Sequence, residues 1–355
     1  EINRNLAIWS SYEPGSTFKI VTLAASLEEN LVDLDNEYFY DGGSVNVEGA
    51  RIKCWKAGGH GHQTFREVVQ NSCNPGFVEL GQRLGKEKLF EYINNFGFGI
   101  KTGIDLNGES SGILFSLDKV GPVELATTSF GQGVSVTAIQ QVAAVSAAVN
   151  GGTLYKPYIV KRLIEPETNE ILKENNPITI RKETSEKVKY ALEHVVALGS
   201  GRNAYIENYR IGGKTGTAQK VKNGAYMVGN YITSFIGILP IDNPEVVLYV
   251  AIDNPKGITA YGGTVAAPIA KTIMEDIITT LEIAPSNEGV KKEYRYYETK
   301  YITIPDVIGL TPKEARAQLS NLNIEYSGTG DTIISTSPKV GSSVKINSTI
   351  KLMLG

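Results

Sequence analysis

The hydrophobic pattern of residues 1–284 predicts helices at both ends of this segment and consecutive strands late in it. Helical spacing is found over 16–29, 63–80 with a break at Asn74-Pro75, 86–96, 138–149, 185–196 and 265–281. Strand signals over 231–239 and 245–252 flank a turn at 240–244. Segment 16–29 is apolar nearly all round, which is typical of a helix buried in the middle of a domain. We therefore predict an α+β domain in which an antiparallel sheet packs against helices.

The pattern changes after residue 284. Residues 285–300 are polar and charged, which predicts a linker. Residues 301–355 then show a strand, a turn, a helix over 312–322 and short strands near 324–326, 332–335 and 349–354. A segment of about 55 residues folds alone, although marginally. We predict a domain over 1–284, a linker over 285–300 and a small α+β domain over 301–355.

Composition excludes several classes of protein. Of the 355 residues, 41% are hydrophobic and 21% are charged, so the chain has enough apolar residues for a sizeable core. The net charge of −3 gives no basic field for binding nucleic acid. No apolar run approaches the length of about 18 residues that spans a membrane, and the start is no signal peptide. Because the periodic pattern starts almost at once, we expect the chain to be a piece of a longer protein.

Segment 12–19, YEPGSTFK, contains the most informative chemistry. Ser16 follows a Pro14-Gly15 turn and begins the predicted buried helix, and Lys19 lies one turn later on the same face. A lysine in an apolar cleft loses part of its preference for charge, so it can take the proton of a serine hydroxyl and activate that hydroxyl as a nucleophile. The alternative is a serine that caps a helix beside an ordinary lysine. A charge without a role is unusual inside an apolar helix, which favours the catalytic interpretation.

Segment 211–218, IGGKTGTA, carries a second motif. Its glycines allow another backbone to approach closely, Lys214 supplies a cation, and Thr215 and Thr217 supply hydroxyls for a carboxylate. A phosphate loop needs glycine at the position that Asn208 occupies, and the residues that follow are not helix-like. The spacing therefore argues against a nucleotide site.

A third motif, Ser72-Cys73-Asn74, offers a hydroxyl and an amide for proton relay and substrate contact. In this order, the three motifs resemble the S-x-x-K, S-x-N and K-T-G set of the penicillin-recognising serine acyltransferases. The segments YEPGSTFK, NSCNPGF, GQGVSVTAIQ and GGKTGTAQ resemble the class B penicillin-binding proteins over nearly all of 1–284. The segments IPDVIGLTPKEARAQL and STSPKVGSSV in 301–355 resemble a single PASTA module. That module and the segment KCWKAGGHG resemble the sporulation-type and division-type members.

The resemblance implies the transpeptidase fold shared with β-lactamases, in which an antiparallel sheet is flanked by helices and joined by an all-helical part. It implies a peptidoglycan D,D-transpeptidase in which Ser16 attacks the penultimate D-Ala carbonyl of a stem peptide and Lys19 is the base. The N–H groups of Ser16 and Thr217 would form the oxyanion hole. The catalytic residues implied are Ser16, Lys19, Ser72, Asn74 and Lys214, and the substrate-binding residues are Thr215, Gly216 and Thr217.

The same resemblance implies partners and location. Peptidoglycan stem peptides would be substrates, and β-lactams would acylate Ser16 as slow substrates. A glycosyltransferase would be a partner at the membrane. The protein would lie on the extracytoplasmic face of the bacterial cell membrane, anchored by an N-terminal segment outside this chain. Synthesis of the spore cortex and synthesis of the septal wall both remain open.

Other functions compete with this one. A β-lactamase shares the motifs but needs a base that activates water for fast deacylation, and the sequence identifies none. A β-lactam sensor would be acylated without cross-linking peptides. A non-catalytic scaffold would bind cell wall through its PASTA module, but intact Ser16, Lys19 and Lys214 argue against it.

The two cysteines lie close together with two histidines between them. Cys54, His60, His62 and Cys73 make up the ligand set of a closed tetrahedral zinc site, and nearby glycines would let the loop wrap a metal. Such a zinc would be structural, because no position is open for water. A disulfide between the cysteines is an alternative, and so are two reduced buried thiols. The histidines would then contact substrate or solvent.

Overall fold

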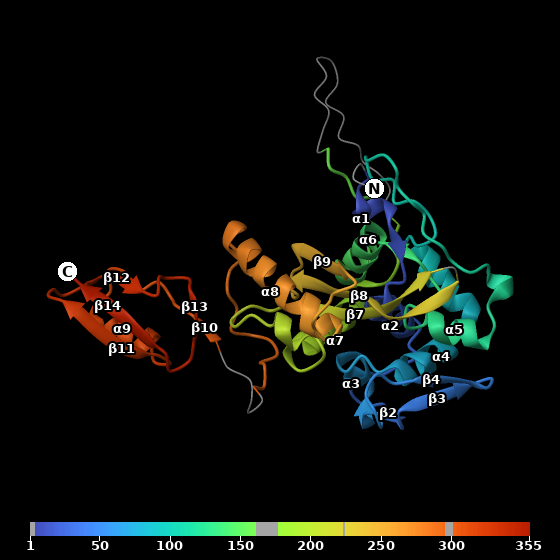
Figure 1. Cartoon of the computed structure of the whole chain (residues 1–355), viewed down its shortest axis with the longest axis horizontal. Helices are drawn as coiled ribbons and strands as arrows, with labels where there is room; N and C mark the ends of the chain where they lie inside the picture. Colours follow the sequence, from blue (N-terminus) through green and yellow to red (C-terminus); the bar gives the residue numbers. More distant parts are fainter. Residues whose placement is uncertain (1–3, 161–176, 223, 295–300) are drawn as a thin grey trace, which may run out of the picture. The chain divides into compact units, whose positions relative to one another are not determined.

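The computed structural model describes residues 4–160, 177–222, 224–294 and 301–355 (Figure 1). The chain divides into two units, Glu1–Lys292 and Glu293–Gly355, which are described separately below. Among the described residues, no helix combines the length and the apolarity needed to cross a membrane.

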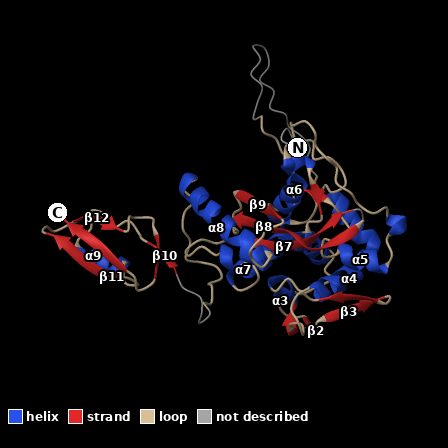
Figure 2. Ribbon diagram, in the orientation of Figure 1, coloured by secondary structure: helices blue, strands red, loops and turns tan. Residues whose placement is uncertain are grey.

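A three-stranded antiparallel sheet lies at the centre of the first unit (Figure 2). Its strands, in spatial order, are β7 (Gly212–Lys222), β8 (Ala225–Leu239) and β9 (Val246–Asp253). On β8, Phe235 and Leu239 face the helix α8 (Gly262–Thr280), whereas Ile236 and Ile238 join the core on the other face. Because residues alternate between the two faces of a strand, both faces of β8 are buried.

A buried helix, α2 (Lys19–Glu28), is the centre of the second core of this unit. Every residue from Lys19 to Leu27 is buried, as the all-round apolar pattern predicted. Around it pack α4 (Asn74–Asn95), α6 (Ala138–Val149) and α7 (Lys182–Ala197). The helix was expected from Ser16, but residues Gly15–Thr17 form a 3₁₀ turn, η1, because Phe18 N donates to Gly15 O at 3.0 Å.

Helix α4 joins two segments that the sequence predicted separately. It begins at the Asn74-Pro75 break, where Cys73 is the N-cap residue, and continues to Asn95. The irregular point lies instead at Gly85, whose φ of 71° and ψ of 164° bend the helix. Residues 63–64, which were expected to be helical, belong to a strand because the Thr64 side chain caps α3 (Phe65–Gln70) by accepting from Glu67 N.

Two small sheets lie beside α3 and α4. Strands β2 (Tyr38–Asp41) and β5 (Gly61–Thr64) pair antiparallel, with Asp41 opposite Gly61 and Tyr40 opposite His62. Strands β3 (Ser44–Val47) and β4 (Ala50–Lys53) form a hairpin between them in the chain. The remaining elements of this unit are α1 (Leu6–Trp9), β1 (Ser11–Tyr12), η2 (Leu117–Lys119), α5 (Pro122–Thr128), β6 (Val136–Thr137) and η3 (Arg202–Ala204).

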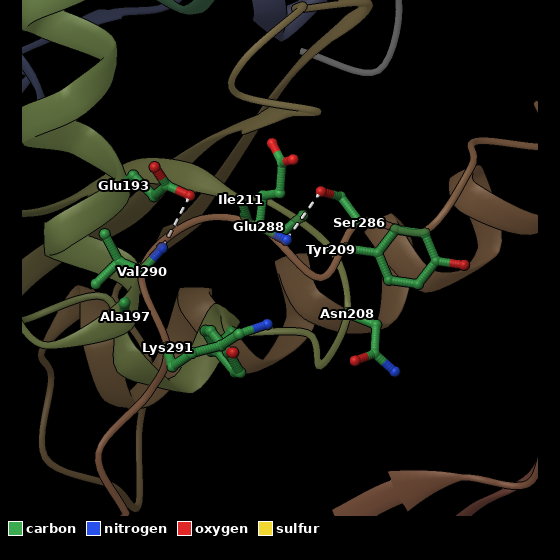
Figure 3. A pocket seen from close by; sticks show the side chains of 10 residues that line it. Glu193, Ala197, Asn208, Tyr209, Ile211, Ser286, Glu288, Val290 and Lys291 are labelled. Carbon is green, nitrogen blue, oxygen red and sulfur yellow. Dashed lines mark hydrogen bonds between the residues drawn. The ribbon is translucent and has the colours of Figure 1, made fainter. Parts of the chain in front are cut away.

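The segment after α8 packs against the rest of the first unit along residues 286–292. Val290 N donates to Glu193 Oε1 at 3.4 Å, and Ser286 N donates to Asn208 O at 2.7 Å. Figure 3 shows this segment beside Glu193 and Tyr209, around a hollow that none of the three motifs lines. The sequence placed these residues in a linker because they are polar, but their backbone groups find partners on the domain. Residues 295–300 of the predicted linker lie outside the described residues.

The second unit is a small α+β domain. Its elements are β10 (Tyr301–Thr303), α9 (Pro312–Gln318), β11 (Asn323–Gly328), β12 (Ile333–Ser337), β13 (Ser343–Lys345) and β14 (Thr349–Leu354). Strand β14 pairs parallel with β11 and antiparallel with β12, and β10 pairs with β13. Its core includes Leu319, Ile333, Ile350 and Leu352. The predicted helix 312–322 ends four residues early because Leu319 leaves helical geometry as the C-cap.

Candidate active site

The amine of Lys19 lies in the core of the first unit, where three oxygen atoms surround it. Its Nζ donates to Ser72 O at 2.9 Å and to Asn74 Oδ1 at 2.7 Å, and lies 3.2 Å from Ser72 Oγ. The ring of Phe77 lies 5.0 Å away and closes the apolar side. Only 1% of Lys19 is exposed, so these contacts replace water around the amine.

The hydroxyl of Ser72 lies between two buried lysines. Lys214, which is fully buried on β7, donates to Ser72 Oγ at 2.7 Å and to Thr215 O at 3.2 Å. Ser72 occupies the tight connection between α3 and α4, at a φ of 55°. This left-handed conformation is uncommon for a residue other than glycine, and the connection directs the hydroxyl toward both amines.

Ser16 lies on the 3₁₀ turn and is half-buried. Two glycines let this turn approach β7 closely. A Cβ at Gly216 would stand 3.1 Å from Pro14 O, and one at Gly15 would stand 3.1 Å from Thr217 O. Both distances are closer than ordinary contacts, so only glycines allow the turn and the strand to approach this far. The structure therefore brings Ser16 beside the K-T-G segment.

The hydroxyls of β7 have their own partners. Thr215 Oγ1 donates to Ser200 Oγ at 3.0 Å, and Thr217 Oγ1 accepts from Gly262 N at 3.0 Å. Ser200 was not predicted from the sequence, and it follows α7 in a connection without any motif that singles it out. It adds a hydroxyl to the side of the site that Thr215 occupies.

Burial sets the electrostatics of the two lysines. Removal from water lowers the pKa of Lys19 to about 7, against a weaker opposing effect of the nearby thiols. Burial and the neighbouring amine of Lys19 lower the pKa of Lys214 well below its ordinary value. Two like charges that share one hydroxyl are unfavourable, so a neutral amine is accessible near neutral pH.

A second cluster lies directly behind Ser72. Its members are Asp41, Cys54, His60 and Cys73, whose ligand atoms all lie within 4.8 Å of one another. Burial raises the pKa of Asp41, but hydrogen bonds from Cys54, from the Gly43 amide and from His60 outweigh it and lower that pKa to about 2. The carboxylate is therefore ionised at neutral pH.

His62 does not belong to this cluster, in contrast to the ligand set expected from the sequence. On β5 the side chain of His62 is exposed and its ring lies 4.9 Å from that of Tyr40, whereas Gln63 is buried. Asp41 takes its place, because the pairing of β2 with β5 brings residue 41 opposite Gly61. Asp41 lies thirteen positions before Cys54, outside the cysteine and histidine motif. Only the pairing of β2 with β5 would have indicated that Asp41 belongs to the cluster.

The Ser16 turn rests on Gly131, which gives a prediction for stability. Gly15 N donates to Gly131 O at 3.0 Å, and a Cβ at Gly131 would overlap the Gly15 carbonyl oxygen at a φ of +84°. We expect Gly131→Ala to lower the free energy of unfolding by about 2–3 kcal/mol and to slow the reaction of Ser16 with penicillin that the family resemblance implies. Denaturant unfolding measures the first effect and penicillin labelling the second.

Gly108→Ala is the matched control, because Gly108 has a φ of +88° with nothing within 4 Å of its Cβ position. It should cost only the backbone strain of about 1 kcal/mol and leave labelling unchanged. Equal losses in the two variants would contradict a role for the contact between Gly131 and the Ser16 turn.

Comparison with known proteins shows which families and relatives this chain resembles. Residues 2–275 match the family described as the penicillin binding protein transpeptidase domain, and residues 302–355 match the PASTA domain. Stage V sporulation protein D of Bacillus subtilis is 60% identical over 99% of this chain and 55% of its own length. The chain thus spans about half the length of the curated relatives it matches.

Solved structures share the fold of the first unit. The transpeptidase domain of penicillin-binding protein 3 from Burkholderia pseudomallei is 29% identical with a TM-score of 0.73, over 81% of this chain and 85% of that one. Penicillin-binding protein 3 from Mycobacterium tuberculosis, complexed with aztreonam, is 29% identical with a TM-score of 0.74, over 82% of this chain and 67% of that one.

Proposed function

Because the chain belongs to the penicillin-binding protein transpeptidase family, we propose that it is a serine-type peptidoglycan D,D-transpeptidase with a PASTA domain. The fold predicted from the sequence motifs is confirmed. The observation that carries the proposed activity is the pair of buried lysines that share Ser72 Oγ, beside the turn of Ser16. Buried amines close to the half-buried Ser16 suit acyl transfer through a covalent intermediate.

The proposed first step forms an ester on Ser16. Its Oγ attacks the carbonyl carbon of the penultimate D-Ala, and its proton passes to Lys19. The terminal D-Ala then leaves with a proton returned through Lys19 and the Ser72 hydroxyl. In the second step the amine of a neighbouring stem peptide attacks the ester carbonyl, which forms the cross-link and restores the Ser16 hydroxyl.

The contacts of Lys19 support its role as the base. A neutral amine has two N–H groups and one lone pair. Ser72 O and Asn74 Oδ1, at 2.9 and 2.7 Å, accept the two N–H groups. The third contact of Nζ is the Ser72 hydroxyl, at 3.2 Å, so in this proposal the lone pair takes the Ser16 proton directly or through Ser72 Oγ.

Strand β7 provides the groups proposed to bind substrate. The hydroxyls of Thr215 and Thr217 would hold the substrate carboxylate, and the close approach at Gly216 sets the spacing between turn and strand. The N–H groups of Ser16 and Thr217 would bind the developing oxyanion, where such donors contribute several kcal/mol to catalysis. We propose Ser200 as a further contact on the carboxylate side, because it holds Thr215.

A β-lactam would acylate Ser16 and remain bound as the ester. The likeness to a penicillin-binding protein complexed with aztreonam supports this proposal. A β-lactamase would release the product rapidly through an activated water, and a sensor would be acylated without acting on peptides. This acyl transfer needs no cofactor, and a zinc ion would have only a structural role.

The relatives support a place in cell-wall synthesis. The 60% identity to stage V sporulation protein D favours a role in sporulation, and so in the spore cortex. The protein would bind its substrate on the extracytoplasmic side of the membrane. A membrane anchor and a glycosyltransferase partner, both implied by the family resemblance, complete the proposal.

Two measurements on the full chain test the function. Intact-mass spectrometry after incubation with penicillin should show one adduct that persists for hours, and a stem pentapeptide should release D-Ala. A short-lived adduct with turnover of penicillin would favour a β-lactamase. A lasting adduct without D-Ala release, even with an acceptor amine present, would favour a sensor. Failure of both would favour a scaffold.

The lowered pKa of Lys19 predicts the pH dependence of acylation. Because the base is the neutral amine, the acylation rate should rise with pH, level off above the pKa of about 7, and fall about tenfold per pH unit below it. Asn74→Asp tests the assignment, since a carboxylate in place of the amide that lies 2.7 Å from Nζ favours the charged amine. Its midpoint should move up by about one pH unit or more. An unmoved midpoint in a folded variant would assign the titration to another group.

A further inference from the structure

The segment that follows α8 lies along the connection between α7 and β7. We define this segment, residues 286–292, as the strap, and the connection as residues 198–211. The connection carries Ser200 near its start and continues into β7, where Lys214 and Thr215 lie. The strap therefore lies against a part of the chain that leads from one group of the proposed active site to another.

The strap contacts the connection at both of its ends and in its middle. Ser286 N donates to Asn208 O at 2.7 Å, and Lys292 Nζ donates to Arg202 O at 3.3 Å. Between these two hydrogen bonds, Val290 packs against the apolar core that the connection shares with α8. The strap thus spans the connection from Arg202 to Asn208, with an apolar contact between two polar ones.

The middle of the strap lies on an ion pair that joins α7 to the start of β7. Arg210 Nε and Nη2 donate to the two oxygens of Glu193 at 2.9 and 2.7 Å, and only 5% of Glu193 is exposed. Val290 N donates to Glu193 Oε1 at 3.4 Å (Figure 3). Because a bidentate pair fixes direction as well as distance, it sets the position of α7 relative to β7. The strap covers one side of this pair.

Gly289 is the residue that lets the strap approach the ion pair so closely. A Cβ at this position would overlap Glu193 Oε1 and would stand 2.7 Å from Arg210 Nε. The φ of Gly289, +91°, also lies in a region that residues with a side chain rarely adopt. Both the space and the backbone conformation therefore require glycine at this point of the strap.

The connection also contacts the candidate active site. Ser200 N donates to Gln70 O at 3.0 Å, two residues before Ser72, and Ser200 Oγ accepts from Thr215 Oγ1 at 3.0 Å. Ser200 thus lies between the S-x-N motif and the K-T-G strand. Because Ser200 and Thr215 are hydrogen-bonded to each other, a shift of the connection would move or separate the two hydroxyls.

We propose that the strap positions Ser200 and Thr215 for the carboxylate of the substrate. This inference rests on the proposed transpeptidase function and adds positioning residues to it. Gly289 and Val290 are positioning residues in this account, because they act through the ion pair and not on the substrate. Groups that are already held in place lose less conformational freedom when they bind a ligand, so a docked strap strengthens their hold on the carboxylate.

Gly289→Ala in the full chain tests this role with two reagents, a penicillin that has its free carboxylate and the methyl ester of the same penicillin. Acylation of Ser16 by the free acid should slow about tenfold, and acylation by the ester should change by less than about twofold, because the ester has no carboxylate to bind. Equal slowing with both reagents, or no slowing with either, would overturn the proposal.

Gly108→Ala is the matched control for this variant. Gly108 has a φ of +88°, so the substitution brings the same backbone strain, but nothing lies within 4 Å of its Cβ position. Neither rate should change in this control. Selective slowing with the free acid in Gly108→Ala as well would show that strain anywhere in the first unit produces the effect, and would overturn the role of the strap.

Amide hydrogen exchange without any ligand tests the positioning apart from the chemistry. In Gly289→Ala, residues 198–217 should exchange about tenfold faster, whereas those of the buried helix α2 should not change. Val290→Asp removes the apolar contact of the strap by another route and should give the same pattern. Unchanged exchange over 198–217 in both variants would overturn the proposal, even if acylation slowed.

The two proposals fail in different ways. If the unmodified chain were acylated by neither reagent while exchange over 198–217 rose in both variants, the transpeptidase function would be refuted and the positioning of the connection by the strap would be supported. If the unmodified chain were acylated and the variants kept its rates and its exchange, the function would stand and the strap would have no part in it.

Discussion

Ser16→Ala should abolish the covalent penicillin adduct and lower D-Ala release from a stem pentapeptide on the order of 10⁶-fold, the scale of nucleophile removal in serine hydrolases. The reason is that Ser72, the serine of the S-x-N motif, is not equivalent to Ser16. Ser72 Oγ already accepts a hydrogen bond from Lys214 at 2.7 Å. Only 6% of Ser72 is exposed, so its hydroxyl cannot reach a substrate carbonyl. Intact-mass spectrometry after prolonged incubation measures the adduct.

Ser26→Ala is the control for this variant. Ser26 is a buried serine on α2 whose hydroxyl donates within its own helix, to Thr22 O at 2.8 Å. It should label at the rate of the unmodified chain. Residual one-to-one labelling of Ser16→Ala, mapped to another residue, would refute Ser16 as the nucleophile.

Lys19→Met should lower the acylation rate constant by about 10³-fold or more, since it removes the proposed general base and its hydrogen bonds. Methionine fills a similar volume and removes the desolvation cost of the amine, but Ser72 O and Asn74 Oδ1 lose their donor, so we expect a folded variant that is less stable by about 1–3 kcal/mol. Stopped-flow acylation by a chromogenic β-lactam gives the rate, and thermal unfolding checks the fold.

Lys189→Met provides the comparison at a distant site. Lys189 is 8% exposed, donates to Asp242 O at 2.9 Å and pairs with Glu186 at 2.9 Å. It should lose stability without losing acylation. If a folded Lys19→Met variant acylated within tenfold of the original rate, a different group would have to be the base.

The sequence predicted elements well where local signals mark both ends. Segment 138–149 is a helix with those bounds, because Thr137 caps its start by accepting from Gln140 N and Asn150 caps its end. Other elements depend on distant partners. Asp41 meets Gly61 only through strand pairing, and hydrophobic spacing of four-residue strands is too short to predict that pairing. Residues 286–292 contact the domain through backbone groups, which no side-chain pattern records.

The same distinction applies to the site. Ser16 and Lys19 were paired from their spacing along one helical turn, whereas the role of Lys214 came from the resemblance of its K-T-G motif to the family. The set Cys54, His60 and Cys73 also came together as expected. His62 did not, because residues 60 and 62 fall in a loop and a strand, and the chain direction between them depends on Gly61 at a φ of 73°. Backbone geometry of this kind is set by the fold and not by spacing.

The left-handed backbone of Ser72 limits how the active site can change in evolution. A serine is most simply replaced by threonine if a hydroxyl must be kept, and that change needs one nucleotide. At a φ of 55°, however, a β-branched side chain clashes with its own backbone. Threonine would keep the chemistry and lose the conformation, so the conservative route is closed at this position. Variants that escape β-lactams while keeping the proposed transpeptidation are therefore expected to arise around Ser72 and not at it.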